Sequence, residues 1–159
     1  MKDEKKPSGV VVATNHEAFR DYFILESFEV GIVLVGCEVK SLRQSKASLS
    51  GSFARIEEDE VYLHNFHIAP YEMGNRANPE PLRERKLLLR RPEIEKLKGK
   101  TQLKGLTLIP FKIYFNKKGL LKVELALAKG KNLFDKRSDI KKKVVSREID
   151  RAIKNRNTK

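Results

Sequence analysis

The sequence predicts a mainly β domain: a closed or nearly closed antiparallel barrel with short embedded helices and a basic C-terminal tail. With 159 residues, 40% of them hydrophobic, the chain can bury one core without disulfides or structural metal. Runs of aromatic and β-branched residues recur between turn residues, which is typical of antiparallel strands. Closing such a sheet into a barrel removes its exposed edges, so we favour a barrel over an open sheet.

The first predicted element is a long, curved strand over residues 21–36, DYFILESFEVGIVLVG. Its apolar alternation is only approximate, and Gly31 lies inside it, so we expect a bend or bulge at this glycine. A short helix should follow over Cys37 to Lys46, because Val39, Leu42 and Arg43 recur at helical spacing.

The middle of the chain predicts a hairpin, a strand and a second helix. Two short apolar runs flank the acidic residues 57–60, which indicates a hairpin with a charged tip. The KLLL run at 86–89 reads as a buried strand. The following helix should begin at Pro92 and end near Gly99, because proline suits the first turn and glycine weakens a helix.

The last strands of the body form a predicted long hairpin. Residues 105–115 and 120–128 are rich in strand-forming side chains and flank the turn NKKG. Pro110 cannot donate a backbone hydrogen bond, so we expect it at an edge or a bulge. The body of the chain is thereby complete at about Ala128.

The net charge of +13 and the pI near 9.9 make a polyanion the expected partner. Basic side chains gain free energy by releasing counterions from nucleic acid, and an anionic membrane surface is the rival partner. No apolar run reaches the 18 residues of a membrane span, and the N-terminus lacks a signal-peptide core. With Cys37 as the single cysteine, these features predict a cytoplasmic protein without an internal disulfide.

The positive charge is concentrated at the C-terminus. Residues 129–159 carry 12 basic and 4 acidic side chains, whereas the preceding 128 residues carry 22 and 17. This asymmetry predicts three parts: a short, flexible polar arm over 1–9, a barrel-forming body over 10–128 and a basic tail over 129–159.

The sequence gives no candidate catalytic residue, metal ligand set or cofactor site. His64 and His67, if they share one strand, face opposite sides and cannot share a metal. The GKT of residues 99–101 resembles the end of a phosphate loop, but Ile94 replaces its first glycine. The acidic residues 57–60 fit a solvated turn better than an ion site. We therefore predict a protein that is not an enzyme.

Four segments, in order and spacing, carry a resemblance to a known family: FEVGIVLVGCEVKSLR, IAPY, PLRERKLLL and ALAKGKNLFDKRSDIKKK. The chain resembles the SsrA-binding proteins, also called small protein B. This resemblance implies an RNA-binding barrel of the OB type. It also implies an adaptor that binds transfer-messenger RNA as a monomer and delivers it to stalled ribosomes for trans-translation. Such an adaptor needs no cofactor, binds no membrane and catalyses no reaction.

The resemblance also implies a set of RNA-binding positions: Asn15, Glu29, Glu38, Lys40, Arg43, Leu88 and Lys122. A carboxylate can accept hydrogen bonds from base amino groups or 2′-hydroxyls, so the two glutamates would contribute selectivity. Two alternatives stay open at this point. Glu38 can instead cap or pair near the first helix, and Leu88 can instead belong to the core.

By the same resemblance, the tail contacts the decoding centre and message channel of the stalled ribosome, through residues Gly130, Lys131, Phe134, Asp135, Lys136, Arg137, Lys141, Lys143, Arg147 and Arg151. Wound as a helix at about 100° per residue, the tail gathers five basic residues within an arc of about 80°; they are Lys136, Lys143, Arg147, Arg151 and Lys154. Its apolar side is small. We therefore expect a tail that is disordered when free and helical on the ribosome.

Three alternatives to the adaptor hypothesis stay open, two for the whole chain and one for the tail. The chain can be a basic OB-type structural protein of the ribosome, or a nuclease acting on stalled message, although a nuclease requires clustered carboxylates or a histidine pair. The tail can also be a nonspecific solvated segment.

Overall fold

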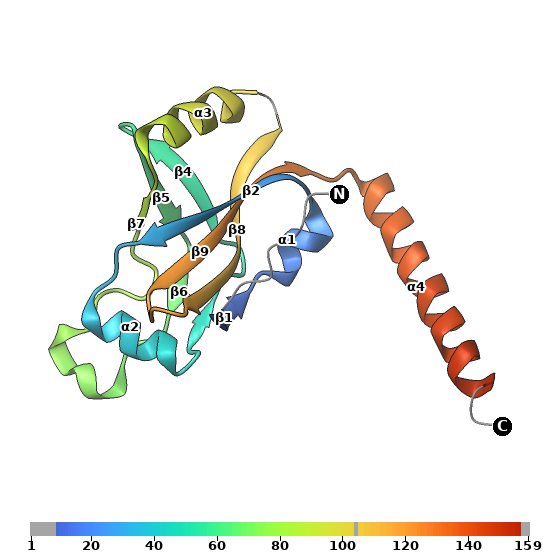
Figure 1. The fold of residues 1–159 in the computed structure, drawn as a ribbon, viewed down its shortest axis with the longest axis horizontal. Helices are drawn as coiled ribbons and strands as arrows, with labels where there is room; N and C mark the ends of the chain where they lie inside the picture. Colours follow the sequence, from blue (N-terminus) through green and yellow to red (C-terminus); the bar gives the residue numbers. More distant parts are fainter. Residues whose placement is uncertain (1–8, 104, 157–159) are drawn as a thin grey trace.

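The computed structural model describes residues 9–103 and 105–156 and consists of a β-barrel, flanking helices and a projecting C-terminal helix (Figure 1). The strands are β1 (Gly9–Thr14), β2 (Tyr22–Ile32), β3 (Ala47–Ser48), β4 (Phe53–Glu57), β5 (Glu60–His64), β6 (His67–Ile68), β7 (Arg85–Leu88), β8 (Leu106–Asn116) and β9 (Leu121–Gly130). The helices are α1 (His16–Asp21), α2 (Gly36–Arg43), the 3-10 helix η1 (Glu72–Ala77), α3 (Arg91–Thr101) and α4 (Leu133–Arg156). This confirms the predicted class, mainly β with short helices.

Strand β8 closes the barrel. The main sheet runs in the order β1-β8-β4-β5-β7-β2-β9, and β8 also pairs with β9, so the strands from β8 to β9 form a ring. All of these pairings are antiparallel. The β8–β9 ladder extends from Leu106↔Lys129 to Phe115↔Leu121, whereas β4 meets β8 at Ala54↔Leu108. The long hairpin therefore supplies most of the closing contact.

The second half of strand β9, residues 125–128, is buried on both of its faces. Val123, Leu125 and Leu127 belong to the main core, together with residues such as Leu63 and Leu108. The alternate residues Ala126 and Ala128 belong to a second cluster, with Ala18 of α1 and with Ile109 and Phe111 of β8. Successive side chains of a strand point to opposite faces, so α1 must cover the outside of the barrel where β9 carries only alanines.

Two predicted hairpins are confirmed, with their turns where the sequence places them. Strands β4 and β5 pair from Phe53↔His64 to Glu57↔Glu60, and Glu58 and Asp59 have positive φ in the turn. In the β8–β9 hairpin the register shifts between Pro110 and Lys112, which confirms the bulge expected at this proline.

Three expectations about element boundaries are corrected. The irregularity in β2 lies between Ile24 and Glu26, whereas Gly31 pairs in register with Lys122. Helix α3 continues through Gly99 to Thr101, since one interior glycine costs only about 1 kcal/mol. Helix α2 ends at Arg43, because Ser45 has a left-handed backbone with φ 56°.

The sequence analysis did not predict four of the elements: β1 and α1 near the N-terminus, and the two-residue strands β3 and β6 in the middle of the chain. Of the predicted arm over residues 1–9, all but Gly9 lies outside the described residues. Within the described ranges, none of the helices combines the length and apolar character of a membrane span.

The tail forms helix α4, which leaves the barrel and projects away from it (Figure 1). Its apolar side chains keep about half of their surface exposed; they include Ile140, Val144, Val145, Ile149 and Ile153. In this structure the tail thus has the helical conformation that was expected on the ribosome. Disorder of the free tail stays a prediction, and it rests on this lack of burial.

We predict that α4 is the first element to open in the free protein. Amides of residues 141–154 should exchange with deuterium far faster than those of β8 and β9, because packing does not stabilise the helix. Hydrogen exchange read by mass spectrometry on the intact chain measures both regions at once. Equal protection of the two regions would contradict the expectation.

Candidate nucleic-acid interface

One row of residues crosses four strands on the outside of the barrel. Tyr114 of β8 pairs with Lys122 of β9, Lys122 pairs with Gly31 of β2, and Gly31 pairs with Leu88 of β7. Directly paired residues in an antiparallel sheet point to the same face. Glu29, two residues before Gly31, shares this face. The structure therefore brings together three of the predicted RNA-binding residues, namely Glu29, Leu88 and Lys122.

Glu29 is held in place by a neighbour that the sequence analysis missed. The Tyr114 hydroxyl donates a hydrogen bond to Glu29 Oε2, and Lys122 Nζ lies 3.9 Å from Glu29 Oε1. Burial, and then the hydrogen bond to Glu29, raise the pKa of Tyr114, so its hydroxyl remains a donor at neutral pH. The Glu29 side chain is still 58% exposed. Its carboxylate is thus oriented but open to a further donor.

Leu88 lies on the surface, over Gly31. Its neighbour Leu87 is 1% exposed and fills the core position that the KLLL run requires, while Leu88 is 53% exposed. A Cβ at Gly31 would lie 3.3 Å from Leu88 Cβ and 3.4 Å from Leu88 Cδ1. The glycine therefore leaves room for Leu88 to lie flat on the sheet, and the alternative that Leu88 is a core residue is wrong.

Helix α2 presents the basic pair Lys40 and Arg43. These residues lie three positions apart, and both are exposed. Lys40 Nζ lies 5.5 Å from the centre of the Tyr71 ring, a cation–π distance that restrains the side chain. The segment before α2 is fixed to β7, since the Val33 N–H donates to Lys86 O at 2.9 Å.

Glu38 is buried and fully engaged inside the protein. It is 3% exposed and accepts hydrogen bonds from Val35 N at 2.9 Å, Arg83 Nη2 at 2.6 Å and Arg85 Nε at 2.8 Å. Burial by itself raises the pKa of Glu38, but the hydrogen bonds, that from Arg83 first, bring it below its usual value. This geometry is that of the capping and pairing alternative, and a direct RNA contact would have to break these bonds.

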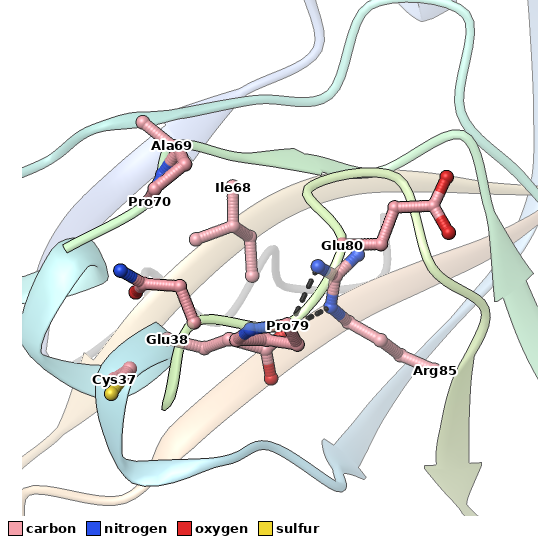
Figure 2. A pocket seen from close by; sticks show the side chains of 9 residues that line it. Cys37, Glu38, Ile68, Ala69, Pro70, Pro79, Glu80 and Arg85 are labelled. Atoms are coloured by element: carbon pink, nitrogen blue, oxygen red, sulfur yellow. Dashed lines mark hydrogen bonds and ion pairs between the residues drawn. The ribbon is translucent and has the colours of Figure 1, made fainter. Parts of the chain in front are cut away.

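Arg85 extends this network through the interior, beside the pocket shown in Figure 2. Its side chain has no exposed surface and donates to Phe66 O at 2.6 Å and to Pro81 O at 3.0 Å. The guanidinium also lies 5.2 Å from the centre of the Phe66 ring. Arg85 and Glu38 together tie α2 to the loop that precedes β7.

Asn15 is also a buried, internally bonded residue. It is 4% exposed and caps α1 by accepting a hydrogen bond from Ala18 N at 3.1 Å. Its amide donates to Pro110 O at 3.2 Å, at the bulge of β8. The seven predicted RNA-binding residues therefore fall into three groups: the surface row, the exposed side of α2 and two buried positions, Asn15 and Glu38.

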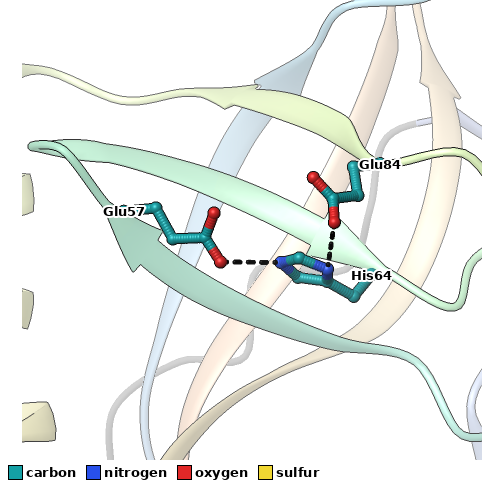
Figure 3. Close-up of side chains that lie close together, drawn as sticks. All are labelled: Glu57, His64 and Glu84. Atoms are coloured by element: carbon teal, nitrogen blue, oxygen red, sulfur yellow. Dashed lines mark ion pairs between the residues drawn. The ribbon is translucent and has the colours of Figure 1, made fainter.

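His64 lies between two carboxylates, as Figure 3 shows. Its Nε2 is 3.5 Å from Glu57 Oε1, and its Nδ1 is 3.2 Å from Glu84 Oε1. His64 ends β5 and His67 begins β6, so the premise of one continuous strand was wrong. The His64 ring thus lies between a carboxylate of the β4–β5 hairpin and a carboxylate of the loop before β7.

The predicted tail residues divide between the junction and the projecting part of the helix. Gly130 ends β9; Lys131, Asp135 and Lys136 make contacts at the base of α4. The others are exposed along the helix: Phe134, Arg137, Lys141, Lys143, Arg147 and Arg151.

Known proteins resemble the chain over nearly its whole length. Residues 12–155 match the family described as SmpB protein. An SsrA-binding protein of Moorella thermoacetica is 57% identical over 146 residues, which is 92% of this chain and 94% of that protein. An SsrA-binding protein of Geobacillus thermodenitrificans is 54% identical over 151 residues, 95% of this chain and 97% of that protein.

A solved structure resembles the fold as well. A chain of the structure "tmRNA-SmpB: a journey to the center of the bacterial ribosome" is 56% identical, with a TM-score of 0.64. The match covers 76% of this chain and 84% of that chain.

The buried network predicts a large stability effect at Glu38. The change Glu38→Ala should lower the free energy of unfolding by about 3 kcal/mol, because Arg85 would remain buried without its charged partner. Urea denaturation followed by circular dichroism measures this change. Glu80→Ala, at an exposed residue of the same pocket, is the matched control and should have almost no effect. Equal stability of the two variants would refute a structural role of Glu38.

Proposed function

The chain belongs to the SmpB protein family, and from this premise we propose that it is the RNA-binding adaptor of trans-translation. It binds transfer-messenger RNA and delivers that RNA to stalled bacterial ribosomes. The observation that carries the proposal is the likeness, at 56% identity, to a chain of a solved structure described as tmRNA-SmpB in the bacterial ribosome. The pairing of RNA with protein in that description favours an adaptor over a structural ribosomal protein.

The surface row is the proposed centre of the RNA contact. The Lys122 ammonium pairs with phosphate, the exposed Leu88 side chain packs against a sugar or base, and Glu29 accepts from base amino groups or 2′-hydroxyls. A carboxylate would repel an RNA backbone if it were free to approach phosphates. Tyr114 holds it beside Lys122, which supports a selective acceptor at this position.

The two buried residues act through their neighbours in this proposal. Glu38 and the arginines around it hold α2, so that Lys40 and Arg43 keep a fixed place on the RNA-binding side. Asn15 holds α1 against the β8 bulge. Loss of either side chain would lower RNA affinity by disordering the surface rather than by removing a contact.

The tail is the proposed ribosome-reading part. Its exposed basic side chains suit the phosphate-lined decoding centre and message channel, and the exposed Phe134 ring can stack on a base. In this proposal the protein supplies no catalytic residue, binds the RNA as a monomer and acts in the cytoplasm, where the stalled ribosomes are.

The first functional prediction concerns Lys122. The change Lys122→Ala should weaken transfer-messenger RNA binding by about 1 to 2 kcal/mol, the value of a charge-assisted hydrogen bond. Gel-shift titration with a thermal melt of the same sample separates lost contact from lost fold. Lys118→Ala, in the exposed turn of the same hairpin, removes the same charge away from the row and should have a smaller effect. Equal losses in the two variants would argue against a localised site.

The second functional prediction separates the two parts of the chain. A protein that ends after Gly130 should retain RNA affinity within about threefold, because the proposed row lies wholly on the barrel. It should fail to support tagging of nascent chains on stalled ribosomes. An RNA titration and a reconstituted tagging assay on the same sample test this. Full tagging by the truncated protein would make the tail a solvated appendage, and loss of RNA binding would assign the tail to the RNA site.

A further inference from the structure

The base of α4 is fastened to α1 and the start of β2 by charged contacts. We propose that Asp21 is a positioning residue, which sets the direction in which α4 leaves the barrel through its ion pair with Lys136. This inference rests on the proposed function, since it assigns Lys136 to the junction rather than to a direct ribosome contact.

The backbone brings the two segments together first. Tyr22 pairs with Gly130 at the last register position of β2 and β9, and the Lys131 N–H donates to Asp21 O at 2.8 Å. The chain therefore enters α4 from a fixed point beside the end of α1. This contact alone fixes a position, but it leaves the helix free to swing about that point.

The Lys131 side chain adds a second attachment. It is only 9% exposed, and its Nζ lies 4.9 Å from the centre of the Phe23 ring. The ammonium donates to Phe19 O at 3.3 Å and to Asp139 Oδ2 at 2.6 Å. One enclosed cation thus links the end of α1, the first residues of β2 and the second turn of α4.

Asp21 supplies the third attachment. Its Oδ1 lies 3.0 Å from Lys136 Nζ, and its Oδ2 accepts from Arg20 Nη2 at 3.1 Å. These cations, Arg20 first, hold the pKa of Asp21 at about 2, so the carboxylate is charged throughout the neutral range. Arg20 Nε also donates to Oδ1 at 3.2 Å, so Arg20 and Lys136 share this oxygen and both cations hold the carboxylate in place.

The two ion pairs lie on one face of α4. Lys136 and Asp139 are three residues apart, so both side chains face the barrel, and two points on one face prevent the helix from swinging. Asp135 also caps the helix start, since its Oδ2 accepts from Asn132 N at 3.3 Å. A partly exposed ion pair contributes little alone, so the junction depends on the combination of these contacts.

This geometry gives different roles to the three consecutive tail residues 135–137. Asp135 caps the helix and Lys136 pairs with the barrel, whereas Arg137 is exposed. A change at Lys136 therefore reduces activity by misdirecting the helix, and a compensating change at Asp21 can restore it. A direct ribosome contact by Lys136 could not be restored in this way.

A charge exchange tests the proposal. Asp21→Lys and Lys136→Asp, each alone, should reduce the tagging rate on stalled ribosomes by about tenfold, because a small misplacement of a positioned group is costly. The double variant should return to within about twofold of the wild-type rate. All three should bind transfer-messenger RNA as the wild type does. Arg20→Gln, which removes the other cationic partner of Asp21 but keeps the pair with Lys136, is the comparison variant and should reduce tagging less than either single charge reversal.

A distance measurement tests the same geometry without the ribosome. Spin labels at Lys118→Cys and Ser146→Cys, in a Cys37→Ser background, report the position of α4 relative to the barrel by double electron–electron resonance. The distance distribution should be broader in each single variant than in the otherwise wild-type chain, and it should return to the wild-type width in the double variant.

The outcomes separate this inference from the proposed function. Normal tagging by both single variants, or no recovery in the double variant, would overturn the positioning role of Asp21. If the wild-type chain itself supports no tagging, the proposed function fails. The distance distributions then still decide whether the Asp21–Lys136 pair directs the helix.

Discussion

The register of β2 between β9 and β7 is the constraint on which the candidate RNA face depends. It aligns Lys122, Gly31 and Leu88 in one row and keeps Glu29 on the same side. A slip by one residue would turn this set into the core and expose Val30, which is now 3% accessible. The closed ring fixes the register, because β9 must meet β8 and β2 at once. Closure of the barrel therefore also determines which side chains lie together on the candidate RNA face.

A second constraint is polar and lies inside the protein. Charges are costly to bury, and the Glu38 carboxylate and the Arg85 guanidinium are tolerated because nearly every polar atom has a partner. Apolar packing could fill the same volume, but it would not fix the angle of α2 so strictly. The interior network thus determines which side chains the surface can offer.

Local signals explain which elements the sequence predicts. The NKKG turn, the acidic hairpin tip and Pro92 act within a few residues, and those elements are found where expected. The partners of candidate site residues are set by tertiary contacts: Tyr114 and Glu29 are 85 positions apart, and Arg85 and Glu38 are 47 apart. Gly31 suggests a bulge until Leu88 is known to lie over it. Helix α1, with six residues, is too short for a clear periodic pattern.

In its helical form, α4 is a rod attached to the barrel at one end. Its 24 residues, at about 1.5 Å each, give a length of about 36 Å. A tilt of about 10° at the base moves the far end by about 6 Å, more than one helical turn. Angular error at the attachment is thus amplified into positional error at the tip. The precision with which Arg151 can be aimed is therefore set at the opposite end of the rod, in the few ångströms around Asp21.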